Sequence, residues 1–313
     1  MPESGAGTLS RGDGTLAGVG ISTSHTILYT MIAAMVALWS GNFVIAKIAL
    51  REFPPLLLSG LRVSLASLLI LPLYLWKGGR WSRSDVPMLL GLGILGVTAN
   101  QLFFVLGMSR TTVAHSAIII GTTPVCVLIV AAVLGMERIT FTKMGGMALA
   151  LTGVTILQMF RAPDAAARGG ATPLGDFFIF IAALTFALFT VGGKRFSLRH
   201  DAITVNTFAY VGGAVTLAPI TVWQAQRISL TAISPAAWAS LAYMALFPSV
   251  VCYLIYYYAL RRISASRVSA FSYLQPLIAT VMAVGILGER VTWPVIAGGS
   301  IIFAGVFLTE KSR

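Results

Sequence analysis

The 313-residue chain is poor in charge, and above all in acidic side chains. Charged residues make up 10% of it, with 10 Asp and Glu against 22 Lys and Arg, and every acid falls in a tail, a turn or the end of an apolar run. This scarcity disfavours a proton relay or a sodium site built on buried carboxylates. It also disfavours a binding site that pairs with multivalent cations.

Cysteines and catalytic signatures are scarce as well. Cys126 and Cys252 lie inside apolar runs, so they are interpreted as small core residues, and no disulfide framework is indicated. The sequence has no glycine-rich phosphate loop, no HExxH pattern and no Ser-His-Asp arrangement. It therefore predicts a protein that is not an enzyme and that uses no metal and no cofactor.

Apolar residues are what the chain has in abundance. They make up 57% of it, and the mean hydropathy of +0.86 lies far above that of a soluble domain. Runs of about 20 residues, which is enough to cross the bilayer as helices, recur throughout. The prediction is an all-α integral membrane protein with ten transmembrane helices, at about 26–47, 56–76, 86–108, 113–134, 141–160, 173–194, 202–223, 235–259, 265–287 and 291–309.

The distribution of basic residues predicts the orientation. The net charge of +12 is dispersed among the turns, which fits the positive-inside rule better than a nucleic-acid partner. With the N-terminus inside, 14 of the 22 basic residues fall in cytoplasmic segments and seven outside. We expect a multi-pass protein of the cell inner membrane with both termini cytoplasmic, a disordered tail over residues 1–25 and a short C-terminal segment, 310–313.

The chain also contains an internal repeat at a shift of 152 residues. Five spans fit in each copy, and because five is odd, equivalent helices cross the membrane in opposite directions. We expect two inverted five-helix repeats at 26–160 and 173–309, joined by a linker at 161–172, which is the architecture of many alternating-access transporters. The matched pairs include Pro124 with Pro276, Glu137-Arg138 with Glu289-Arg290, Gly146 with Gly298, and Gly153-Val154 with Gly305-Val306.

Polar and aromatic residues inside the spans are candidates for the substrate site. Unpaired amides and cations are costly in lipid, so they should face protein or a watery cavity. Arg62 or Lys47 is predicted to bind a carboxylate as a hydrogen-bonded ion pair, although Arg62 snorkelling to the interface and Asn42 bonding between helices remain alternatives. The candidate substrate-binding residues are Trp39, Asn42, Lys47, Arg62, Asn100, Gln101, Tyr253, Tyr273 and Gln275.

Three further residues have candidate roles in conformational change. Pro124 and Pro276 lie within apolar runs and are predicted to be hinges or static kinks, because proline removes a backbone donor. His115, near the start of the fourth span, is a candidate for proton coupling or is simply hydrogen-bonded.

Several segments together resemble a known family. These are L-W-S-G-N-F-V-I-A-K, P-P-L-L-L-S-G-L-R, A-H-S-A-I-I-I-G-T-T-P-V and the run from A-S-R-V-S to G-E-R-V-T. Over residues 26–309 the chain resembles the EamA branch of the drug/metabolite transporter superfamily, except that Met136 separates Gly135 from Glu137 where the family has a Gly-Glu pair. The resemblance implies ten helices, inverted repeats, cytoplasmic termini and export of small metabolites or amino acids.

The function predicted from the sequence is therefore secondary transport, with export of small metabolites such as amino acids by alternating access. A drug or nucleotide-sugar carrier of the same superfamily and a non-transport membrane scaffold are the alternatives. The expected partners are a small-molecule substrate, either an amino acid or an amphipathic metabolite, and the lipid bilayer. We expect no nucleic acid, and a monomer or weak dimer.

Overall fold

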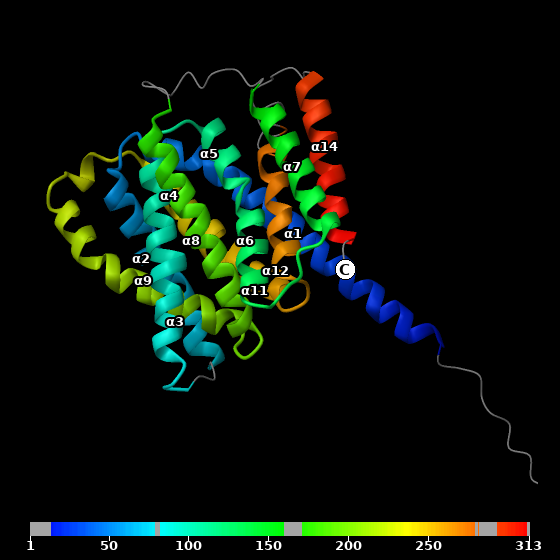
Figure 1. The fold of residues 1–313 in the computed structure, drawn as a ribbon. Helices are drawn as coiled ribbons and strands as arrows, with labels where there is room; N and C mark the ends of the chain where they lie inside the picture. The colour runs from blue at the N-terminus through cyan, green and yellow to red at the C-terminus, as the bar shows by residue number, and fades with distance from the viewer. Residues whose placement is uncertain (1–13, 79–81, 160–170, 279–280, 282–292, 312–313) are drawn as a thin grey trace, which may run out of the picture.

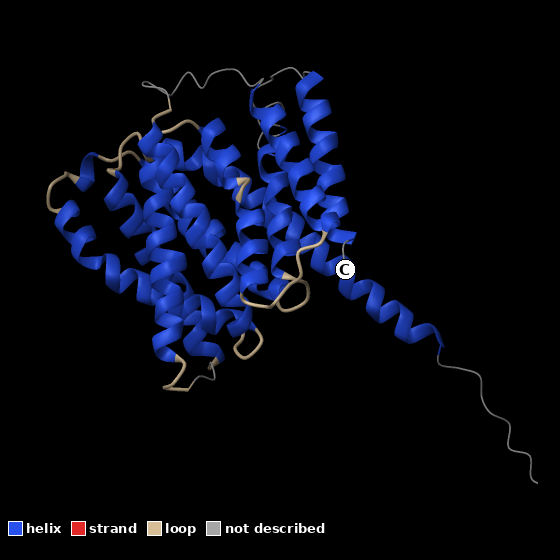
Figure 2. Ribbon diagram, in the orientation of Figure 1, coloured by secondary structure: helices blue, strands red, loops and turns tan. Residues whose placement is uncertain are grey.

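The computed structural model describes residues 14–78, 82–159, 171–278, 281 and 293–311. Within these ranges the chain forms helices joined by turns, and it contains no strand (Figure 2). The all-α prediction is confirmed. The α-helices are α1 (Gly14–Ala49), α2 (Pro55–Lys77), α3 (Val86–Gly93), α4 (Asn100–Met108), α5 (Val113–Ile120), α6 (Thr123–Val133), α7 (Phe141–Met159), α8 (Pro173–Ser197), α9 (Ala202–Ala225), α10 (Pro235–Met244), α11 (Cys252–Leu260), α12 (Ala265–Ala270) and α14 (Trp293–Lys311).

Seven helical stretches in the described ranges are long and apolar enough to cross a membrane. They are Thr26–Ala49, Pro55–Lys77, Val86–Met108, His115–Val133, Pro173–Ser197, Ala202–Ala225 and Pro235–Leu260. The expected spans at 141–160 and 291–309 correspond to α7 and α14, which have 19 residues each. The expected span at 265–287 continues into residues outside the described ranges. The chain is therefore a multi-pass membrane protein, and the count of ten spans stays a prediction.

The first helix is longer than the sequence predicts. It begins at Gly14, so residues 14–25, which were expected to be a disordered tail, extend it away from the bundle (Figure 1). Extending an existing helix costs less free energy than nucleating a new one, so the helix of the span that starts at Thr26 also includes the residues before it. The helix runs unbroken through Ser40-Gly41-Asn42. Gly41 lets Tyr243 approach, and the Tyr243 hydroxyl donates to the Leu38 carbonyl at 2.9 Å.

Two membrane spans contain a π-helical segment. η1 (Ile94–Ala99) separates α3 from α4, and η3 (Ala245–Val251) separates α10 from α11. A shift of 152 residues moves η1 onto residues 246–251, so the two segments occupy equivalent positions in the sequence repeat. Such π-bulges are uncommon and often lie at functional sites, which draws attention to the side chains around both.

The helices α7 and α14 pack closely side by side (Figure 1). A Cβ atom on Gly146 would lie 2.8 Å from the Gly305 carbonyl oxygen, and one on Gly153 would lie 2.7 Å from that of Gly298. The two helices are therefore antiparallel, and glycine allows the close backbone approach. Because the repeat pairs Gly146 with Gly298 and Gly153 with Gly305, the two contacts are equivalent to each other, as a twofold axis between inverted repeats would require.

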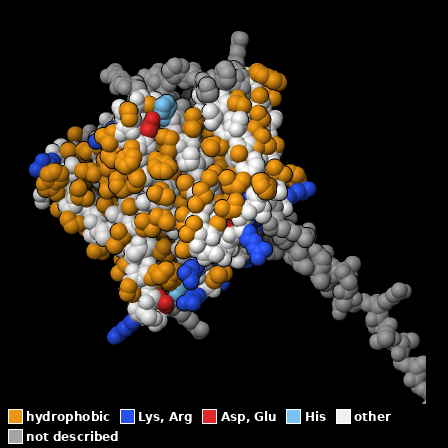
Figure 3. Space-filling view, viewed as in Figure 1, with side chains coloured by type: hydrophobic (Ala, Val, Ile, Leu, Met, Phe, Trp, Pro, Cys, Tyr) orange, Lys and Arg blue, Asp and Glu red, His pale blue; other side chains and the backbone are white. Residues whose placement is uncertain are grey.

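Much of the molecular surface is apolar. In the view of Figure 3, hydrophobic side chains spread across the face of the bundle and the visible Lys and Arg side chains lie towards its margins. On α14, for example, Phe303 and Phe307 are about 60% exposed. Exposed apolar area of this extent indicates a lipid-facing surface.

Candidate functional site

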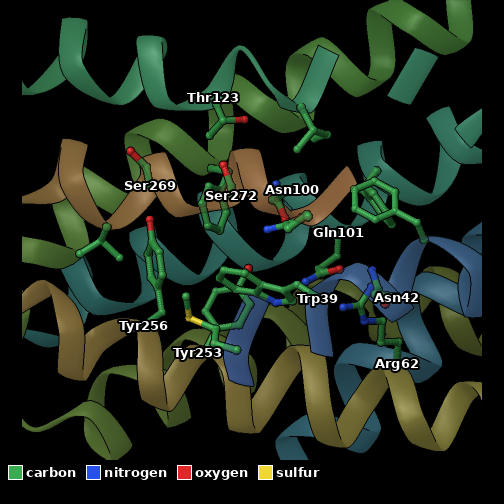
Figure 4. A pocket seen from close by; sticks show the side chains of 17 residues that line it. Trp39, Asn42, Arg62, Asn100, Gln101, Thr123, Tyr253, Tyr256, Ser269 and Ser272 are labelled. Carbon is green, nitrogen blue, oxygen red and sulfur yellow. The ribbon is translucent and has the colours of Figure 1, made fainter. Parts of the chain in front are cut away.

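A pocket with about 750 Å³ of space between its walls, part of it open to solvent, lies inside the bundle (Figure 4). Both halves of the chain contribute to it: α1, α2, α4 and the α5–α6 span from the first, α8, α11 and the α12 region from the second. Its lining residues are Met35, Trp39, Asn42, Phe43, Arg62, Asn100, Gln101, Phe104, Ile120, Thr123, Phe186, Tyr253, Tyr256, Val268, Ser269, Ser272 and Gln275.

Arg62 is the only cation and the only ionic side chain among these lining residues. It projects from α2 and is 2% exposed, so the snorkelling alternative is wrong. Its Nε donates to the Ser249 hydroxyl at 3.0 Å, while its Nη1 has no hydrogen-bond partner among the described residues. A buried guanidinium without a carboxylate is costly, which favours a ligand that supplies the missing negative charge.

Amide side chains lie on the same side of the pocket. Asn42 is 7% exposed, it lies beside Arg62 in Figure 4, and its Oδ1 has no partner in the described part of the chain. Gln101 lies close to both, whereas Asn100 donates its Nδ2 to the Ala182 carbonyl at 2.8 Å. The wall of the pocket therefore contains a buried, unpaired donor on Arg62 and, on a neighbouring side chain, a buried, unpaired acceptor on Asn42.

Four aromatic rings make up the neighbouring wall of the pocket. Trp39, Phe186, Tyr253 and Tyr256 pack against one another with ring centroids 5.4 to 6.3 Å apart, mostly edge-on or tilted. The Tyr256 hydroxyl is held by Thr190 at 2.8 Å. Such a wall suits the apolar or aromatic body of a ligand, because rings bury large areas in defined geometry.

Seven of the nine predicted substrate-binding residues come together in this pocket, although their contact with substrate stays a prediction. They are Trp39, Asn42, Arg62, Asn100, Gln101, Tyr253 and Gln275. Phe186 and Tyr256 were missed, because apolar helices contain many aromatic residues. Ser269 and Ser272 were missed as well, although their spacing of three residues, continued by Gln275, signals one helix face.

Lys47 and Tyr273 lie elsewhere. Lys47 donates its Nζ to the carbonyls of Met108 at 2.6 Å and Thr111 at 2.8 Å, so its cation binds the C-terminal end of α4. Lys47 is not among the residues that line the pocket, and its predicted contact with substrate stays a prediction. Tyr273 is fully buried in an apolar cluster with Leu128 and Met147 and does not line the pocket either.

Lys194 repeats the arrangement of Lys47 in the second half of the chain. Its Nζ donates to the carbonyls of Leu260 at 3.0 Å and Ile263 at 2.6 Å. The acceptors Met108 and Thr111 become Leu260 and Ile263 under the 152-residue shift. The two lysines are 147 residues apart, so they do not match under the same shift, but each binds an equivalent pair of carbonyls within its own half of the chain.

The candidate conformational residues lie near irregular helix segments. The fourth span is interrupted at Gly121-Thr122, between α5 and α6, so Pro124 falls in the first turn of α6. Pro276 likewise follows a 3₁₀ turn, η4 (Phe271–Tyr273). Whether either proline is a hinge or a static kink stays a prediction.

His115 lies outside the pocket, in the first turn of α5. Its Nδ1 is 3.0 Å from the Asp176 carboxylate on α8, and the Thr111 hydroxyl donates to the same carboxylate. Its side chain is about half exposed. The hydrogen-bonded alternative is thus what the structure contains, and the proton-coupling role stays a prediction.

Glu137 joins the two halves of the chain at another point. Its carboxylate accepts from Lys143 at 3.0 Å, from the Ser266 backbone N–H at 3.1 Å and from the Ser266 hydroxyl. Burial alone would raise the pKa of this carboxyl, but the hydrogen bonds from Ser266 and Lys143 outweigh it and hold the pKa below its ordinary value. The carboxylate therefore ties the turn after α6 to the start of α12.

A multi-helix membrane protein with a pocket lined by both halves of its chain has the form of a membrane carrier. The chain matches the EamA-like transporter family over residues 26–159 and again over 173–310, and it belongs to that family. The resemblance inferred from the sequence is confirmed.

Individual relatives agree with this assignment. An uncharacterized transporter of Archaeoglobus fulgidus is 29% identical over 91% of this chain and 98% of its own. The uncharacterized inner membrane transporter YedA of Escherichia coli is 23% identical over 90% of each. A probable terminal-alkyne amino-acid exporter of Streptantibioticus cattleyicolor is 27% identical over 88% of this chain and 91% of its own. A solved crystal structure with 18% identity shares the fold, with a TM-score of 0.72 over 90% of this chain and 96% of its own.

Proposed function

We propose that this protein exports small metabolites with a free carboxylate, amino acids above all, by alternating access between two inverted five-helix repeats. The observation that carries the proposal is the buried Arg62, whose Nη1 is unpaired beside the unpaired Asn42 Oδ1 at one end of an aromatic-lined pocket. Binding a carboxylate would relieve the cost of the buried cation through a charge-assisted hydrogen bond.

The donor and acceptor pair matches an α-amino acid in particular. The carboxylate and ammonium groups of an amino acid are neighbours, so a carboxylate bound to Arg62 brings the ammonium within reach of Asn42. The substrate side chain would then pack against Trp39, Tyr253 and Tyr256. The printed name of the Streptantibioticus relative, a probable amino-acid exporter, supports the same class of substrate.

The proposed mechanism rests on the relation between the two halves. The equivalent contacts of α7 with α14, the equivalent lysine ties and the matching π segments support two inverted repeats. The pocket lies between these halves, where rocking of one repeat against the other would expose it to each side in turn. Pro124 and Pro276 are the proposed hinges, and His115 the proposed site of any proton coupling.

The proposed setting is the cell inner membrane with both termini in the cytoplasm. The excess of basic residues in the segments assigned to the cytoplasm supports this orientation. The name of the YedA relative, an inner membrane transporter, supports the location.

The test is counterflow in proteoliposomes. Vesicles are preloaded with unlabelled amino acids, and uptake of each labelled amino acid is followed without an imposed ion gradient. We expect the wild type to take up at least one amino acid. Asn42→Leu should weaken this uptake more strongly than it weakens uptake of the corresponding carboxylic acid without the amino group. If only nucleotide sugars or cationic dyes competed for uptake, the protein would be a drug or nucleotide-sugar carrier and this proposal would fail. If no solute were taken up, a non-transport scaffold would be favoured.

A further inference from the structure

The π-helical segment η3 (Ala245–Val251) lies directly behind the pocket. Its central residues, Pro248 and Ser249, are buried and do not line the cavity. Pro248 has no backbone N–H, so it cannot donate to the Met244 carbonyl four residues earlier, as an α-helical residue would. The Ser249 hydroxyl donates to that carbonyl at 2.9 Å instead.

The direction of this hydrogen bond determines what else Ser249 can do. With its proton directed at Met244, the hydroxyl oxygen is left as an acceptor, and it accepts from the Arg62 Nε at 3.0 Å. The guanidinium is thereby anchored through Nε, while Nη1 stays unpaired. Because a guanidinium is planar and rigid, fixing one nitrogen fixes the directions in which the others donate.

The adjacent residue orients a second side chain of the pocket. The Pro248 carbonyl accepts from the Trp39 indole Nε1 at 3.1 Å. Trp39 belongs to α1, Arg62 to α2 and the acceptors to the second half of the chain. Two consecutive residues of η3 therefore fix the positions of Arg62 and Trp39 relative to each other.

We propose that Pro248 and Ser249 are positioning residues of the substrate site, and that Ser249 sets the preference for carboxylates by aiming the Arg62 guanidinium. The identity of the ligand as a carboxylate rests on the proposed function. The orientation of Arg62 by Ser249 does not, and it is measurable without any substrate.

The first experiment compares Ser249→Ala with the control Ser240→Ala. Ser240 lies one element earlier, is also buried and donates to the Ala236 carbonyl at 2.8 Å, and it has no hydrogen bond to Arg62. Binding of phenylalanine and leucine, and of phenylalaninamide and leucinamide, is measured on purified protein. We expect Ser249→Ala to weaken binding of the acids about tenfold, as loss of a hydrogen bond to a charged group does, and to change binding of the amides less than about twofold.

The control variants define the alternative outcomes. Ser240→Ala should leave both affinities unchanged, and Ser249→Thr, which keeps the hydroxyl, should restore the preference for the acids. Equal weakening of acids and amides by Ser249→Ala would mean a general packing role and overturn the proposal. Unchanged binding of both would overturn it as well.

The second experiment tests the hydrogen bond between Arg62 Nε and Ser249 by hydrogen exchange. Protein with ¹⁵N-labelled arginine is placed in lipid nanodiscs, and the Nε–H resonance of Arg62 is assigned by its loss in Arg62→Lys. We expect slow exchange of this proton with water in the wild type and in Ser240→Ala, and exchange at least about tenfold faster in Ser249→Ala. Unchanged exchange would overturn the proposal. If the wild type bound no amino acid, the proposed function would fail, and the exchange rates would still decide the role of Ser249.

Discussion

Arg62 is the residue that gives the pocket its chemical character. Its Nη1 is unpaired, and its Nε is held by Ser249. The six acids of the described residues lie outside the pocket, and each is already engaged: Glu137 with Lys143, Asp176 with His115, Asp85 with His200, Asp201 with Lys77, Glu310 with Arg267 and Glu52 with Ser234. No carboxylate of the described residues is therefore left to pair with this cation, which supports the proposed carboxylate ligand.

At the residue scale, Arg62→Ala tests this role. We expect the KM for carboxylate substrates to rise at least about tenfold, because a charge-assisted hydrogen bond is lost. Uptake by the variant and the wild type is compared in proteoliposomes. Arg227→Ala is the matched control, since that guanidinium stacks on Trp223, 3.8 Å from the ring centre and away from the pocket. Intact uptake by Arg62→Ala would remove the carboxylate from the proposed binding mode.

The pair formed by α7 and α14 shows how one element depends on the other half of the chain. Gly305 lies against the α7 backbone, where an added Cβ would approach the Ala150 nitrogen to 2.4 Å. The contact joins the last described helix of the chain to a helix of the first half, so its loss should loosen the bundle as a whole.

At the element scale, Gly305→Val is expected to destabilise the protein. Overpacking of such a contact costs about 1 to 3 kcal/mol, so the midpoint of thermal unfolding in detergent should fall. Gly145→Val serves as control, because a Cβ at Gly145 meets nothing within 4 Å. Both carry the same intrinsic cost of valine in a helix. Equal midpoints for the two variants would show that the close approach of α7 and α14 is unimportant for stability.

At the scale of the whole molecule, Glu137 is a tie between the two halves. Its pKa lies below the ordinary value for Glu in the folded protein. A carboxyl with a lowered folded-state pKa contributes stability that is fully present above the unfolded-state pKa of about 4.3 and is lost as the pH falls through the folded-state pKa.

The corresponding prediction concerns stability against pH. The thermal midpoint of the wild type should fall on acidification from about pH 5 to pH 3, as the pH passes from the unfolded-state pKa of Glu137 towards its lower folded-state pKa. Glu137→Gln should lower the midpoint at about pH 6 and flatten this dependence. The measurement is a thermal unfolding series in detergent. Glu52→Gln is the comparison. The Glu52 carboxylate accepts from Ser234, much as Glu137 accepts from Ser266, but it is exposed to solvent, so this substitution should change the thermal midpoint less. Identical pH dependence in Glu137→Gln and the wild type would contradict the role of this tie.

The sequence by itself determined the class of the protein and its internal repetition. Apolar runs of about 20 residues leave helices as the only way to satisfy the backbone in lipid, and the 152-residue shift predicts the relation that the glycine contacts of α7 and α14 later display. Polar residues inside such runs are costly, so Arg62, Asn42 and Gln101 were identifiable as cavity residues one by one.

Only the tertiary structure decided which of these residues meet. Lys47 and Arg62 look alike in sequence, yet Lys47 binds two carbonyls at the end of α4 while the Nη1 of Arg62 remains unpaired beside the pocket. The aromatic residues differ in the same way, since Tyr253 and Tyr256 line the pocket and Tyr273 lies within an apolar cluster. The acceptors that fix Trp39 and Arg62 come from Pro248 and Ser249, roughly 200 residues further along the chain. Such pairings depend on packing between the halves, which local periodicity does not encode.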